Sequence, residues 1–149
     1  IEVAAKMSQE NSVAIHLRKG DDYMQSELMG KGLCTVDYYM KAIDYMRKHI
    51  NNPHFYVFTD NPCWVKDNLP EFEYMLVDWN EVAGQRNFRD LQVMSCAKHN
   101  IIGNSTYSWW AAWLNANQDK IVVGPKRFFN PINSFFSTCD IMCEDWISL

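Results

Sequence analysis

The stretch with the most chemical potential is His16-Leu17-Arg18-Lys19-Gly20-Asp21, which follows the apolar residues Val13-Ala14-Ile15. Arg18 carries a planar fork of donors that matches phosphate oxygens, and Lys19 adds a point charge. Gly20 lets the backbone turn sharply or approach a ligand closely. At the end of a buried strand, these residue types favour a phosphate-binding site. A strand that simply ends in solvated charges has the same composition, and the residues alone leave both interpretations open.

Two further polar clusters have a similar setting. Thr59 to Asn61 follow the apolar run Phe55 to Phe58, and Asn104 to Ser108 precede a helical segment that begins with two tryptophans. Hydroxyl and amide side chains cap helix starts, where free backbone N–H groups bind anions. In a parallel sheet the three clusters would meet at one edge and fit a nucleoside diphosphate. Polar loops also commonly contain such residues.

Each candidate residue has a functional and a structural interpretation. Arg18 and the helix start would hold phosphates, and Asp60 would accept hydrogen bonds from a purine amine or a ribose. His16 would suit a general base because its unperturbed pKa lies near neutrality. A single histidine after an apolar strand is, however, more often a core residue. For Asp21, Asp60 and Asp90, solvation or capping is the ordinary alternative.

Three tryptophans, Trp109, Trp110 and Trp113, lie at helical spacing. Their rings could stack on a sugar or a base, but this spacing favours a place in the core. We therefore predict that all three are packed inside the protein.

Alternating strand-like and helix-like segments are expected to position these clusters. Residues 1–11 are interpreted as a frayed segment or the remnant of a helix, and the last 25 residues as an irregular aromatic segment packed over the sheet. Thr35 is a plausible N-cap, and Pro53 closes the helix that follows it. We predict one Rossmann-like α/β domain over residues 1–149, with right-handed crossovers. The expected strands are 13–17, 55–58, 74–77, 99–103 and 120–123, and the expected helices are 36–50, 64–69, 88–98 and 109–114.

Composition narrows the classes of function. The chain has 149 residues, 48% of them apolar, which suits one domain with a sizeable core. A net charge of −4 argues against a general nucleic-acid-binding protein. Five scattered cysteines are typical of reduced thiols in a cytosolic setting.

No apolar run has the length of a membrane span, and no signal peptide is visible. Neither a Gly-x-Gly-x-x-Gly nor a Walker A pattern occurs, which argues against NAD-dependent or kinase-like chemistry.

Two motifs carry a family resemblance. The stretch His16 to Asp21 resembles the His-x-Arg-Arg-Gly-Asp motif of the α-1,2- and α-1,6-fucosyltransferases. The stretches Asp90 to His99 and Asn104 to Trp110 resemble the α-1,2-fucosyltransferases, glycosyltransferase family 11. The resemblance runs from about Val13 to Pro131 and covers roughly the C-terminal half of a family member. It implies one half of a GT-B-like fold, the half that binds the sugar nucleotide, without the N-terminal acceptor half.

The resemblance implies an inverting transfer of L-fucose from GDP-β-L-fucose to the 2-hydroxyl of a terminal galactose of a glycan, without a metal or other cofactor. It implies that Arg18 binds the β-phosphate and that Asp60 reads guanine, whereas Asp90 holds the site loops. His16 and Asp21 match motif positions without a settled role, and we count them with Arg18 as candidate catalytic residues. The implied donor-binding residues are Arg18, Lys19, Gly20, Thr59, Asp60, Asn104, Ser105, Thr106 and Ser108.

Lys19 departs from the motif because it replaces the second arginine, and it keeps the charge without the bidentate fork. We expect this fragment to be inactive alone and to come from a bacterial-type cytoplasmic enzyme, with a location at the membrane periphery as the alternative. The alternative is a non-catalytic module that binds a nucleotide or a sugar. A structural domain without a ligand is a third interpretation.

Overall fold

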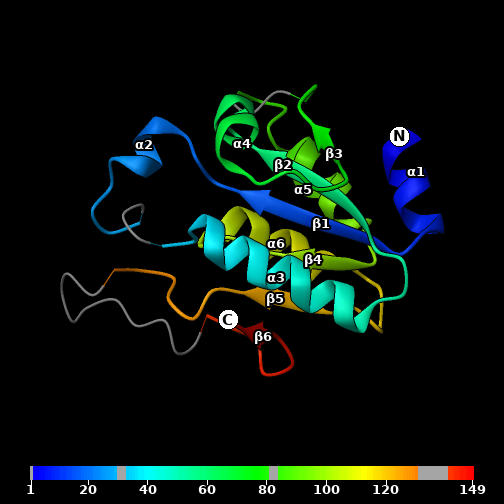
Figure 1. The fold of residues 1–149 in the computed structure, drawn as a ribbon. Coiled ribbons are helices and arrows are strands. Elements are labelled where there is room, and N and C mark those ends of the chain that lie inside the picture. The colour runs from blue at the N-terminus through cyan, green and yellow to red at the C-terminus, as the bar shows by residue number, and fades with distance from the viewer. Residues whose placement is uncertain (1, 30–32, 81–83, 131–140) are drawn as a thin grey trace.

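A computed structural model describes residues 2–29, 33–80, 84–130 and 141–149. Its centre is one six-stranded sheet in the order β3-β2-β1-β4-β5-β6, in which every neighbouring pair is parallel (Figure 1). This arrangement confirms the predicted Rossmann-like α/β class. The strands are β1 (Ser12–Leu17), β2 (His54–Thr59), β3 (Tyr74–Val77), β4 (His99–Ile101), β5 (Val122–Gly124) and β6 (Ile147–Ser148).

Strand β1 is buried on both faces, as a central strand of a parallel sheet must be. Its odd-numbered residues, Val13, Ile15 and Leu17, belong to the larger apolar cluster on one face of the sheet. Ala14 belongs to a second cluster on the opposite face. The two-residue period of a strand therefore divides β1 between two cores.

Helices cover both faces of the sheet. Helices α3 (Val36–His49) and α4 (Pro62–Asn68) pack on one face, and Figure 1 shows α3 crossing in front of the strands. Helices α1 (Glu2–Gln9), α5 (Phe88–Ser95) and α6 (Thr106–Leu114) contribute to the clusters on the opposite face. A short helix, α2 (Asp21–Met24), follows β1 directly.

Helix α3 forms where the sequence predicts it. Thr35 is its N-cap, and the Thr35 side chain accepts a hydrogen bond from the backbone N–H of Tyr38 at 3.4 Å. The buried residues Tyr39, Ile43 and Met46 recur at helical spacing and face the sheet. Tyr39 also donates its hydroxyl to the backbone carbonyl of His16, at 3.0 Å, and so connects the helix to the end of β1.

Several boundaries differ from the predictions. The sheet has six strands rather than about five, because residues 147–148 pair with β5; a two-residue strand is too short to show a period. Of the two interpretations of residues 1–11, a frayed segment or a helix, the structure agrees with the helix, which is α1. Helix α2 was not predicted, and α5 ends at Ser95 rather than at residue 98. Of the aromatic tail, Phe128 is buried as expected, whereas residues 131–140 lie outside the described part.

The strand order places a crevice at the centre of the sheet. Strands β2 and β3 continue the sheet on one side of β1, and β4, β5 and β6 continue it on the other. Leu17 at the end of β1 pairs with Thr59 at the end of β2. In open α/β sheets, ligands bind outside the carboxyl ends of the strands where the order reverses. Here that point lies between β1 and β4.

Candidate functional site

Two adjacent hollows open at the carboxyl edge of the sheet, and both are lined by Arg18, Ser105 and Thr106. The polar hollow has a volume of about 360 Å³ and the aromatic hollow about 320 Å³. Both hollows lie at the reversal point of the strand order. The polar hollow is further lined by His16, Thr59, Asp60, Asn87, Asp90 and Tyr107. The aromatic hollow is further lined by Asp22, Tyr23, Ser26, Met29, Asn104, Phe128 and Phe129.

Arg18 stands on the boundary between the hollows, and two carboxylates hold its guanidinium. One terminal nitrogen, Nη1, donates to Asp60, and the other, Nη2, donates to Asp22 at 2.6 Å. The Arg18 side chain remains 33% exposed. The arginine is therefore fixed in direction and still reachable by a ligand.

Asp60 fixes the loop that follows β1. Besides Arg18, its carboxylate accepts the backbone N–H groups of Lys19 at 2.6 Å and of Gly20 at 2.9 Å. Gly20 makes this approach possible, because a Cβ at position 20 would lie 2.5 Å from an Asp60 oxygen. The backbone of Gly20 is extended, so space rather than conformation requires a glycine here. The role of Asp60 in reading guanine stays a prediction.

Lys19 points away from both hollows. Its ammonium group is buried on the α3 and α4 side, where it donates to the carbonyl of Cys34 at 3.0 Å and lies 4.6 Å from the ring centroid of Trp64. Burial lowers the pKa of Lys19 from its ordinary value. The structure therefore gives the lysine an anchoring contact and does not bring its charge to the predicted donor site.

The start of α6 forms the opposite wall of the boundary. Ser105 occupies the N-cap position, yet its hydroxyl caps none of the N–H groups of the first turn. Ser105 and Thr106 line both hollows, whereas Ser108 is buried and bonds to the carbonyls of Gly103 and Ser105. The free backbone N–H groups of an uncapped helix start carry a partial positive charge and therefore attract an anion. Of the three predicted hydroxyl residues of this segment, Ser105 and Thr106 thus reach both hollows, whereas Ser108 supports the helix.

Asn104 is fully buried and connects three segments of chain. Its side chain accepts the hydroxyl of Tyr23 and donates to the carbonyls of Met29, at 2.7 Å, and Phe128, at 3.1 Å. The residue lines the aromatic hollow, but these hydrogen bonds give it a structural role.

His16 lies at the inner end of the polar hollow. Its side chain is buried, and its ring centroid lies 5.5 Å from that of Tyr107. Burial lowers the pKa of His16 to about 4, an effect that Arg18 reinforces and Asp60 opposes. Among the buried side-chain atoms of the described residues, its Nδ1 is the one without a hydrogen-bond partner. At neutral pH, His16 is therefore an uncharged ring whose buried Nδ1 has no hydrogen-bond partner among the described residues.

The other predicted residues take different places. Thr59 lines the polar hollow through the end of β2. Asp90 also lines it and accepts a hydrogen bond from Asn80 at 2.5 Å, and burial raises the pKa of Asp90. Asp21 begins α2, is exposed, and is not among the residues that line either hollow.

Asn87, Tyr107 and Asp22 line the hollows but were not predicted from the sequence to be site residues. Tyr107 donates its hydroxyl to the carbonyl of Asn87 and accepts the backbone N–H of Leu91 at 2.9 Å, which joins the start of α6 to α5. Tyr107 lies inside the predicted Asn104–Ser108 cluster, and this position in the sequence could have indicated that it belongs to the site.

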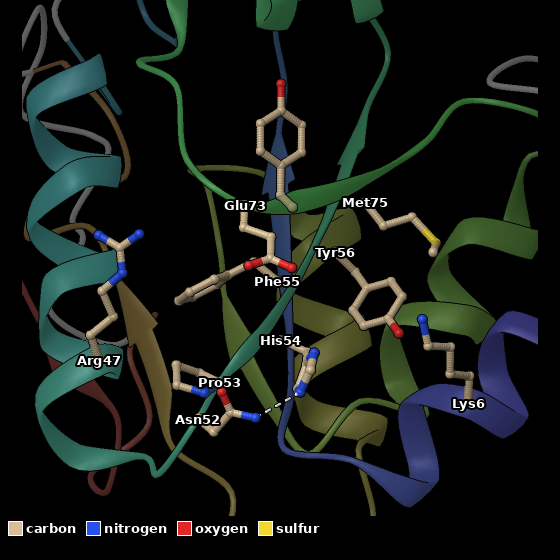
Figure 2. A pocket seen from close by; sticks show the side chains of 10 residues that line it. Lys6, Arg47, Asn52, Pro53, His54, Phe55, Tyr56, Glu73 and Met75 are labelled. Atoms are coloured by element: carbon tan, nitrogen blue, oxygen red, sulfur yellow. Dashed lines mark hydrogen bonds between the residues drawn. The ribbon is translucent and has the colours of Figure 1, made fainter.

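A third hollow lies at the opposite, amino end of the strands and measures about 390 Å³. Figure 2 shows Arg47 entering from α3 and Lys6 from α1, on either side of β2. Its His54 bonds to Asn52 at 3.1 Å and pairs with Glu10 at 3.8 Å. The hollow shares no lining residue with the other two, and the predicted phosphate-binding residues are absent from its walls.

Comparison with known proteins identifies the family. The model of Glycosyl transferase family 11 matches residues 2–149. The chain belongs to this family. It is 36% identical over 142 residues to an alpha-1,2-colitosyltransferase of Escherichia coli, and 37% identical over 142 residues to the O-antigen biosynthesis glycosyltransferase WbnK of the same species. It is 27% identical over 103 residues to the galactoside 2-alpha-L-fucosyltransferase SEC1 of Bos taurus.

The matches extend along most of this chain but along only part of the relatives. The two bacterial alignments include 93% of this chain and 48% and 45% of the relatives, and the bovine alignment includes 68% and 28%. This family member thus spans about half the length of the bacterial relatives. In its described part, no helix combines the length and the hydropathy needed to cross a bilayer.

Proposed function

We propose that the chain is the GDP-fucose-binding part of an inverting α-1,2-fucosyltransferase, which transfers L-fucose from GDP-β-L-fucose to the 2-hydroxyl of a terminal galactose. The observation that carries this proposal is the position of Arg18 opposite the start of α6. Both line the same two hollows, at the reversal point of a parallel sheet. The names of the relatives, which include fucosyltransferases, support the same class of reaction.

The donor's diphosphate lies at the boundary between the hollows in this proposal. Arg18 offers a fork that matches phosphate oxygens, and the N–H groups at the start of α6 add a partial positive charge. Together they stabilise the negative charge that develops on GDP as it leaves, which is the main electrostatic task of the transfer. The proposed chemistry uses no metal ion.

The polar hollow offers acceptors for the guanine N–H groups. Asp60 is our candidate for this contact, although its oxygens already accept three donors. His16 is neutral at pH 7, and its buried Nδ1 has no hydrogen-bond partner among the described residues. In the tautomer that carries its proton on Nε2, Nδ1 can accept a proton or a hydrogen bond from a group that reaches it. With a pKa of about 4, His16 is a weak base, and we therefore keep Asp21 and the remainder of the parent protein as alternative sources of the catalytic base.

Replacement of Arg18 by alanine tests the donor site. A charge-assisted hydrogen bond contributes about 1.5–3 kcal/mol, so we expect Arg18→Ala to weaken GDP binding by roughly 10- to 100-fold. Isothermal titration calorimetry with the purified chain measures the affinity. Circular dichroism of the variant establishes that it remains folded.

Arg47→Ala is the matched control for that experiment. Arg47 is a partly exposed arginine that also pairs with an aspartate, at 3.5 Å, and it lies in the third hollow at the far end of the strands. We expect its replacement to leave GDP affinity within twofold of the wild type. Equal GDP affinity in wild type and Arg18→Ala would refute the assignment of the phosphate site.

A second candidate donor is nucleotide-activated colitose. It is favoured by one observation: the relative named a colitosyltransferase matches at 36% identity over 93% of this chain, against 27% over 68% for the bovine fucosyltransferase. Turnover by the full-length parent with each donor and a galactose-terminated acceptor decides between them. We expect at least tenfold higher turnover with GDP-fucose; the reverse preference would support colitose. GDP binding without turnover of either donor would support a non-catalytic binding module.

A further inference from the structure

The two carboxylates that hold Arg18 differ in how firmly they are themselves held. Asp60 has a side chain that is only 12% exposed, and it also accepts the two backbone N–H groups of the loop. Asp22 has a side chain that is 73% exposed, and Arg18 is its one hydrogen-bonding partner among the described residues. Asp60 therefore belongs to the architecture of the loop, whereas Asp22 depends on Arg18 alone.

Asp22 also lies on the side from which a ligand would arrive. It lines the aromatic hollow together with Arg18, Ser105 and Thr106. Its contact is with Nη2, which leaves Nη1 to Asp60. A phosphate at the boundary between the hollows would compete with Asp22 for Nη2, because an oxygen anion on a guanidinium N–H is the same interaction in both cases.

From this arrangement, we propose that Asp22 is a placeholder for the donor's diphosphate: it occupies Nη2 of Arg18 in the empty site and leaves when a phosphate oxygen binds. The inference rests on the proposed function and specifies which contact sets donor affinity. Asp60 retains its bonds to Nη1 and to the loop, so the guanidinium keeps its direction during the exchange.

The exchange is feasible because the contact given up is weak. Exposed ion pairs contribute little to stability, since water screens them and the side chains lose freedom. A diphosphate carries more charge than a single carboxylate and also gains the start of α6. Nevertheless, Asp22 must be displaced, and its charge repels the ligand, so it lowers the affinity of the site. It is a residue that tunes affinity rather than a catalytic residue.

Titration of GDP into wild type and Asp22→Asn tests this inference. We expect the variant to bind GDP about two- to fivefold more tightly, the factor that corresponds to the loss of one exposed ion pair. Guanosine, which lacks phosphates, should bind both proteins with equal affinity. Asp22 is exposed, so the substitution should leave the fold intact.

Asp37→Asn is the matched control. Asp37 also has a side chain that is 73% exposed, and it pairs with Lys41 in the same i,i+4 relation, at 2.7 Å, but on α3. Its replacement changes the net charge equally and should leave GDP affinity unchanged. If Asp37→Asn tightens GDP binding as much as Asp22→Asn does, net charge explains the effect and the placeholder is rejected.

The remaining outcomes separate this inference from the proposed function. In one outcome, wild type binds GDP through Arg18 while Asp22→Asn binds GDP with unchanged or lower affinity. That result would mean that Asp22 orients the arginine. It would support the donor site and reject the placeholder. A parallel gain in guanosine affinity would also reject it. If wild type does not bind GDP, the proposed function fails and the placeholder fails with it.

Discussion

Burial determines the charge of His16. The ring lies beside Tyr107 at the inner end of the polar hollow, and its pKa is lowered from 6.5 to about 4. In the folded protein, His16 therefore stays neutral at a pH where the unfolded chain would protonate it. Between these two pKa values the unfolded state binds more protons, so the stability of the fold falls as the pH falls.

We predict that this difference is measurable. A shift in pKa from 6.5 to about 4 corresponds to about 3 kcal/mol, which is fully present above pH 6.5 and is lost as the pH falls to 4. Urea unfolding of wild type and His16→Gln, at several pH values, should show the wild type losing about that much relative to the variant. His49→Gln, on an exposed position of α3, serves as the control. Parallel pH curves for wild type and His16→Gln would contradict the prediction.

The individual residues that reach the hollows were partly predictable from the sequence. Arg18 and Ser105 follow strands of a parallel sheet, so their meeting at one edge could be expected from topology alone. The direction of the Lys19 side chain could also have been predicted from the sequence. Lys19 continues the odd-numbered series Val13, Ile15 and Leu17, which faces α3. The motif suggested a second cation instead. The engagement of Asp60 with the loop could not be predicted, since it depends on a contact 41 residues away.

Helix α6 shows why an apolar segment does not reveal its own buried side. Its segment Trp109 to Leu114 is apolar all round, so periodicity does not distinguish its faces. In the structure, the buried residues are the small ones, including Ala111 and Ala112, whereas Trp110 and Trp113 are 50% and 54% exposed. The prediction that the tryptophans fill the core is wrong for these two. Small residues allow the helix to lie close to the sheet, and the larger rings remain outside.

A paired substitution tests this orientation. Ala111→Leu adds volume where α6 meets the second core, and we expect it to destabilise the protein by about 1–3 kcal/mol. Leu114→Ala removes volume from a residue that is 55% exposed, and its effect should stay within about 0.5 kcal/mol. Thermal and urea unfolding measure both. A larger loss in Leu114→Ala than in Ala111→Leu would mean that the opposite side of the helix is buried.

At the scale of the whole molecule, the order of elements along the chain was predictable but their order in the sheet was not. The alternation of apolar strands and periodic helices indicates parallel β-α units from local sequence alone. The order β3-β2-β1-β4-β5-β6 follows from long-range pairing. The pairing of residues 147–148 with β5 could not be predicted either, because no local sequence pattern marks so short a strand.

The three side-chain hydrogen bonds of Asn104 have a consequence for the rims of the aromatic hollow. A single amide holds the loop of Tyr23 and Met29 on one rim of the aromatic hollow and the carbonyl of Phe128 on the other. A rim that swung outward alone would strand a buried polar group, at a cost of about 1–3 kcal/mol. One buried amide thus opposes the outward movement of either rim.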